Sequence, residues 1–223
     1  MMCTLPGGLG PADLAMIAGL GAFHGLNPAM GWLFAVALGL QQRDRGAVTR
    51  ALGPITLGHA VAVVAALALL RVLEVSVPQR VVAWSVAAAL VGFGLVKLLR
   101  QRHPRWVGMR VNARQLALWS FVMASVHGAG LMLYPVMIRA DRAVQQGGAT
   151  APDQTARLTA LLPGGASSAA ALVHTVAMLA VMATVALVVY HLVGVAVLRR
   201  AWLNVDVLWA VALLAGGAFV LLA

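Results

Sequence analysis

The sequence predicts an all-α integral membrane protein, in which six transmembrane helices form two inverted three-helix repeats. Of its 223 residues, 62% are hydrophobic and only 10% are charged, which exceeds the composition of soluble domains. Six apolar runs are long enough to cross about 30 Å of hydrocarbon at about 1.5 Å per residue. We place these runs at residues 12–40, 52–73, 81–99, 115–138, 167–192 and 203–223.

The net charge of +10 comes from cations that flank the apolar runs. Eleven of the sixteen Lys and Arg residues follow the first, third and fifth runs, and five, including Arg71 and Arg139, lie on the other side. Because cytoplasmic loops are enriched in Lys and Arg, we expect the eleven-cation side in the cytoplasm and both termini outside. This indicates a multi-pass protein of a bacterial-type inner (plasma) membrane and argues against nucleic-acid binding.

Three segments recur in the same order in the two halves of the chain: 23–25 with 126–128, 57–62 with 172–177, and 84–87 with 209–212. Each half holds three crossings, an odd number, so the second copy is inverted relative to the first, as in many secondary transporters. We therefore divide the chain into a first three-helix repeat at 1–100, a basic cytoplasmic linker at 101–114 and a second repeat at 115–223. The basic stretch from Lys97 to Arg114 is predicted to contact anionic lipid headgroups.

The first apolar run of each half is interrupted at a His-Gly pair. Proline weakens a helix because it has no N–H and crowds the preceding turn, and glycine lets backbones approach closely. An ionisable side chain in the middle of a membrane helix indicates a functional site. The predicted substrate-binding residues are His24, Gly25, Asn27 and Pro28 at the first interruption, and His127, Gly128 and Gly130 at the second.

Four histidines lie inside the apolar runs at positions that the repeat relates: His24, His59, His127 and His174. Neutral imidazole binds nickel, cobalt, copper and zinc, and it carries protons near neutral pH. These four residues are therefore candidate ligands of a transition metal, either as substrate or as a bound ion. The alternative is that each imidazole only hydrogen-bonds to a neighbouring helix.

The sequence leaves several functions open. No carboxylate is predicted at the depth of the histidines, so the charge of a bound divalent cation would not be compensated. The alternative substrate is therefore a small organic or inorganic anion, which the N–H groups at broken helix ends can bind. A membrane metalloprotein with histidine-bound metal or haem is a third reading, and an assembly partner whose histidines only pack is a fourth. Cys3 is the only cysteine, and the sequence holds no hydrolytic or redox motif, so we do not expect an enzyme.

Six helices in two inverted triplets, with a His/Gly/Pro-broken first helix in each, resemble the lysine-exporter superfamily. That group includes amino-acid exporters, nickel/cobalt transporters and sulfite-type exporters. The resemblance implies a transporter scaffold with central sites at the two broken helices. We thus expect a secondary transporter, an exporter, with a midplane histidine site for a transition-metal cation. Its expected partners are membrane lipid and a small ion or metabolite, and homo-oligomer formation stays open.

Overall fold

The structure is a computed structural model, and it describes residues 9–99, 111–146, 165–193 and 205–222. Over these residues it is all-helical, without a strand. In chain order, the helices are α1 (Pro11–Leu26), η1 (Pro28–Met30), α2 (Trp32–Gln42), α3 (Arg45–Ser76), α4 (Gln79–Leu99), α5 (Ala113–Val126), η2 (Leu131–Leu133), α6 (Tyr134–Gln146), α8 (Ala166–Val188), the π-helical η3 (Val189–Val193) and α10 (Val205–Leu222).

Several of these helices have the length and composition of membrane spans. Among the described residues, α3, α4 and the segment Ala166–Leu192 are each long and apolar enough to cross a bilayer, and the bent pair of α5 and α6 is a fourth candidate. Helix α2 and residues 209–222 are apolar but shorter. In its described residues the chain is thus all-helical, with the properties of a transmembrane protein. The described part of each predicted run is largely helical, while six crossings and their inverted arrangement stay predictions.

The first and fourth apolar runs are interrupted at the two positions that the His-Gly pairs predict. Helix α1 ends at Leu26, and a short 3-10 turn opened by Asn27 and Pro28 leads to Gly31, whose φ of 121° suits only glycine. The second break follows α5, where Gly128 has a φ of 66°. The helix then resumes in a new direction, because α5 and α6 differ by 44°.

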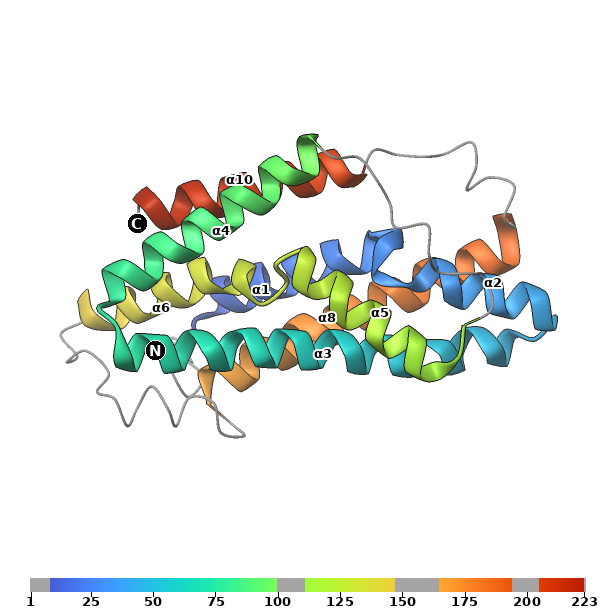
Figure 1. Cartoon of the computed structure of the whole chain (residues 1–223). Helices are drawn as coiled ribbons and strands as arrows, with labels where there is room; N and C mark the ends of the chain where they lie inside the picture. Colours follow the sequence, from blue (N-terminus) through green and yellow to red (C-terminus); the bar gives the residue numbers. More distant parts are fainter. Residues whose placement is uncertain (1–8, 100–110, 147–164, 194–204, 223) are drawn as a thin grey trace.

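The main helix pairs join one half of the chain to the other. Helix α1 packs along α8, α3 along α5, and α4 along α10, and Figure 1 shows α4 in green beside α10 in red. Glycine allows the last of these contacts, since a Cβ on Gly94 would come within 2.9 Å of Leu214, and one on Gly217 within 2.8 Å of Val91. Gly92, by contrast, has open space around it.

One end of the bundle, which we call the ion-pair end, is held together by ion pairs, of which the Arg71–Glu74 pair is buried. The Arg71 guanidinium of α3 lies 2.8 Å from the Glu74 carboxylate and 3.5 Å from that of Asp141 on α6. Arg139 of α6 lies 3.0 Å from Asp13 at the start of α1. Arg71 was predicted to be a loop cation that flanks an apolar run, and this is wrong: Arg71 is 6% exposed and lies inside α3. Its burial is possible because two carboxylates face it.

The predicted linker at 101–114 lies mostly outside the described residues. Its last two residues, Ala113 and Arg114, are the first residues of α5. That helix begins with a capping box, in which the Asn112 side chain accepts from the Gln115 N–H and the Gln115 side chain accepts from the Asn112 N–H.

Candidate functional site

Three of the four predicted histidines gather in the interior of the bundle. His24 comes from the last turn of α1, His59 from the middle of α3 and His174 from α8, and all three are 0% exposed. The His24 ring centroid lies 5.4 Å from that of His59 and 4.8 Å from that of His174. The His59 and His174 rings stack at 5.4 Å. We call these residues the histidine triad.

The triad lies between two apolar layers. One layer contains Ala62 of α3 and Ala171 of α8, on the side of the ion-pair end. The other contains Ile55 of α3 and Met178 of α8. The imidazoles are therefore polar groups in an apolar part of the bundle, where an unmet hydrogen bond is costly.

Glycines bring the three helices close enough for the rings to meet. A Cβ on Gly21 of α1 would collide with the His174 carbonyl oxygen, and one on Gly25 with the Met178 carbonyl oxygen. On α3, a Cβ on Gly58 would collide with the Ala117 carbonyl oxygen of α5. Gly21 and Gly25 are four residues apart, so they share one helix face, as in the small-xxx-small contacts of membrane helices. That spacing is the sequence signal for Gly21, which was not among the predicted site residues.

The triad nitrogens are largely unsatisfied. The Leu20 carbonyl accepts from His24 Nδ1 at 2.9 Å, so Nδ1 carries the hydrogen and Nε2 keeps its lone pair. Within the described part of the chain, His24 Nε2 and both His59 nitrogens have no hydrogen-bond partner. The same holds for His174 by hydrogen-bond geometry, although the Ile17 carbonyl interacts with its ring. A buried polar group without a partner costs about 1–3 kcal/mol, so these nitrogens require an explanation.

The structure separates the fourth histidine from the triad. The Trp209 indole of α10 lies edge-on between them, with its ring centroid 4.2 Å from that of His24 and 5.4 Å from that of His127. Trp209 Nε1 donates to the His127 carbonyl oxygen at 3.1 Å, and the indole stacks on Phe23 at 4.8 Å. His127 Nδ1 in turn donates to the Met123 carbonyl oxygen at 2.7 Å. A direct four-histidine site is therefore absent from this arrangement.

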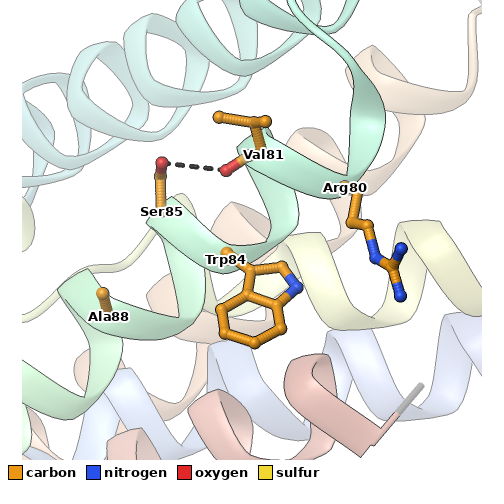
Figure 2. A pocket seen from close by; sticks show the side chains of 5 residues that line it. All are labelled: Arg80, Val81, Trp84, Ser85 and Ala88. Carbon is orange, nitrogen blue, oxygen red and sulfur yellow. Dashed lines mark hydrogen bonds between the residues drawn. The ribbon is translucent and has the colours of Figure 1, made fainter.

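Trp209 was missed as a site residue. Its position inside the run 203–223, away from either end, was the signal that it is not an interface anchor. Its repeat counterpart, Trp84, is 63% exposed, whereas Trp209 is 0% exposed. Figure 2 shows Trp84 and Arg80 on the open face of α4, with Ser85 donating to the Val81 carbonyl oxygen at 2.9 Å. An exposed Trp with Arg one turn away is typical of a helix end at a membrane surface.

The other predicted binding residues lie at the two breaks. Asn27, 2% exposed, accepts from the Ala29 N–H at 3.0 Å, and its Nδ2 has no partner among the described residues. Pro28 opens η1 directly after it. At the second break, a Cβ on Gly130 would collide with Ala66, while the position of Gly128 faces Leu213 and Leu90. The first break therefore adjoins the triad, and the second adjoins Trp209 and the α3 backbone.

The triad has the spacing of a metal site but not the ring orientation. With metal–nitrogen bonds of about 2 Å and tetrahedral angles, imidazole centroids lie about 5 Å apart, close to the observed values. The planes of His59 and His174, however, are within 11° of parallel, so they face each other. In the described part of the chain, no three His, Cys, Asp or Glu side chains are set to hold a metal ion. Coordination by all three would require His59 or His174 to rotate about its side-chain bonds.

No protein family, characterised protein or solved structure in three comparisons matches this chain. The resemblance to the lysine-exporter superfamily is thus a prediction from sequence pattern.

Proposed function

We propose that this protein is a secondary membrane transporter that alternates access around the histidine triad. The observation that carries the proposal is the gathering of His24, His59 and His174, from both halves of the chain, at ring spacings of 4.8–5.4 Å in a buried, apolar interior. Unpartnered imidazoles at the junction of two halves favour a ligand site over packing, because packing alone would leave their nitrogens unsatisfied.

Helix directions support the inverted repeat on which this proposal depends. The ion pairs put the start of α1, the ends of α3 and α6 and the start of α8 at the same end. Helix α1, in the first half, therefore runs in the opposite direction to the broken α5–α6 helix of the second half, as Figure 1 also shows. The pairing of α1 with α8, and of α3 with α5, is what a two-fold axis in the membrane plane would produce.

The ion-pair end holds the two halves of the chain together on one side of the triad. Arg71 contacts Asp141, and its Nε donates to Ser167 at 3.2 Å, so α3 is tied to α6 and α8 of the other half. With the eleven-cation side in the cytoplasm, this end faces outside. The conformation is then closed to the outside, which is the state in which an exporter loads its cargo.

A transition-metal cation is the first proposed substrate. The triad offers several nitrogen lone pairs, and its spacing fits imidazoles around one ion after ring rotation. Nickel, cobalt, copper and zinc all bind such ligands.

A small anion is the second candidate, because one observation favours it. The Asn27 Nδ2 donor is buried beside the first break and has no partner among the described residues. Together with protonated imidazoles, it would bind an anionic group by charge-assisted hydrogen bonds.

The test is transport in proteoliposomes loaded separately with each metal and with small anions. We expect metal flux that His24→Ala abolishes and that His191→Ala, a change at an exposed position on η3, leaves intact. Anion flux with the same dependence on His24 would select the second candidate. Stoichiometric metal or haem that survives dialysis, without flux, would indicate a metalloprotein. Flux unaffected by His24→Ala would remove the triad from the mechanism.

A further inference from the structure

The charges around the triad restrict which metal it can accept. The four carboxylates with described side chains lie away from it: Asp13, Glu74 and Asp141 at the ion-pair end, and Asp44 before α3. The triad itself is neutral when its imidazoles are ligands. The cost of burying an ion rises with the square of its charge, so a divalent ion costs about four times as much as a monovalent one. Among the described side chains, the charges around the triad therefore favour a monovalent metal.

The donors next to the triad are soft. Helix α8 presents His174, Met178 and Met182 at four-residue intervals, and each is 0% exposed. At about 1.5 Å of rise per residue, successive side chains lie about 6 Å apart on one helix face. The α1 break runs along this stretch, since a Cβ on Gly25 would collide with the Met178 carbonyl oxygen and come within 3.0 Å of the Met182 nitrogen.

We infer that the transported ion is a soft monovalent metal, Cu(I), which enters along Met182 and Met178 and is held by imidazoles of the triad. Thioether is a soft ligand that selects Cu(I), and imidazole is a good ligand of copper, whereas nickel is suited by imidazole alone. Cu(I) also accepts low coordination numbers, so two of the three rings suffice. The stacked rings of His59 and His174 are then compatible with binding through His24 and one neighbour.

The direction of the methionine pair fits the proposed transport. Helix α8 begins at the ion-pair end, where Ser167 contacts Arg71. Met178 and Met182 therefore lie on the far side of the triad from that closed end. This is the side from which an exporter would load. The inference rests on the proposed function and names its substrate.

The test measures binding of Cu(I), Ag(I) as an air-stable probe, and Zn²⁺ to the detergent-purified protein by competition with a chromogenic chelator. All variants carry Cys3→Ser, which removes the chain's one thiol as a competing soft ligand. The double variant Met178→Leu and Met182→Leu nearly conserves volume, and Met16→Leu, at a position 41% exposed, is the control. Proteoliposome flux of the same ions is measured in parallel, and thermal melting of each variant confirms folding.

We expect Cu(I) and Ag(I) to bind at one equivalent and to cross the membrane, with Zn²⁺ doing neither. The double Leu variant should weaken Cu(I) binding by about tenfold or more, and Met16→Leu should not. Zn²⁺ flux without Cu(I) flux, or a folded double variant with unchanged Cu(I) affinity and flux, would overturn the inference and leave the proposed transporter standing. Absence of binding and flux for every metal would overturn the inference and leave the anion as the candidate substrate, whereas absence of both metal and anion flux would overturn the proposed function as well.

Discussion

The Trp209 indole lies edge-on against the His24 imidazole, with ring centroids 4.2 Å apart. The same indole donates its Nε1–H to the His127 carbonyl oxygen at 3.1 Å. One side chain of α10 thus connects the two helix breaks, because His24 lies in the last turn of α1 and His127 follows α5. The Trp209 ring therefore contacts both His-Gly positions.

Trp209→Phe should destabilise the fold by about 1–3 kcal/mol, because it leaves the buried His127 carbonyl without this donor. Trp209→Ala should cost about 3–5 kcal/mol, since it adds a cavity beside Phe23 and His24. The measurement is reversible unfolding in mixed detergent. Trp84→Phe is the matched control: Trp84 is 63% exposed, and its substitution should change stability by less than about 0.5 kcal/mol. Equal losses at the two positions would contradict the central role of Trp209.

Gly21→Ala should separate α1 from α8. Its Cβ would collide with the His174 carbonyl oxygen, a backbone atom that cannot move without shifting the helix. We expect a loss of about 1–3 kcal/mol in stability together with loss of substrate binding. Gly19→Ala, on the same helix with nothing within 4 Å of its Cβ, should instead stabilise by up to about 1 kcal/mol through helix propensity. If both variants behaved alike, the close α1–α8 contact would be wrong.

Composition and the lengths of the apolar runs were enough to predict a helical membrane protein, because a chain segment that crosses lipid must satisfy its own backbone hydrogen bonds and does so as a helix. The apolar runs and both His-Gly breaks were predicted within a few residues. The packing of the helices against one another was harder to predict from the sequence. Trp209 contacts His24 on α1 and donates to the His127 carbonyl oxygen 82 residues away, and Arg71 faces a carboxylate on α6, 70 residues later. A local pattern can mark such residues but does not identify their distant partners, so four histidines were predicted to lie together where the structure gathers three.

Arg71→Met should destabilise the protein by about 3–5 kcal/mol, because Glu74 and Asp141 would lose the cation that faces them. The side chains of Arg71 and Glu74 are 7% and 2% exposed, so water cannot replace the missing partner. Arg50→Met is the control, since its ion pair with Asp44 is largely exposed and should matter little. Unfolding of the two variants under the same conditions makes the comparison. A small loss of stability in Arg71→Met would show that water reaches the carboxylates at the ion-pair end.

Asp44 should give the start of α3 a pH-dependent stability. A hydrogen bond from Arg50 and another from the Gly46 N–H lower the pKa of the Asp44 carboxyl below its usual range. Because the folded-state pKa is lowered, the contribution is present above the ordinary pKa of Asp and is lost as the pH falls through the folded-state pKa. Asp44→Asn can still cap the helix but does not titrate. The melting difference between wild type and Asp44→Asn should therefore shrink on acidification. A difference that does not change with pH would contradict the lowered pKa of the Asp44 carboxyl.

His59→Leu should raise stability while it abolishes transport. Both His59 nitrogens are buried and lack a partner among the described residues, so an apolar side chain of similar size removes an unsatisfied group. If the imidazole is a ligand, the same change removes a donor from the triad, and flux should fall to background. His191→Leu, at an exposed position, should leave flux intact. Unfolding in detergent and flux in proteoliposomes are measured on the same preparations. A variant that is less stable and still active would mean that His59 has a structural hydrogen bond, and the triad would then be a packing feature.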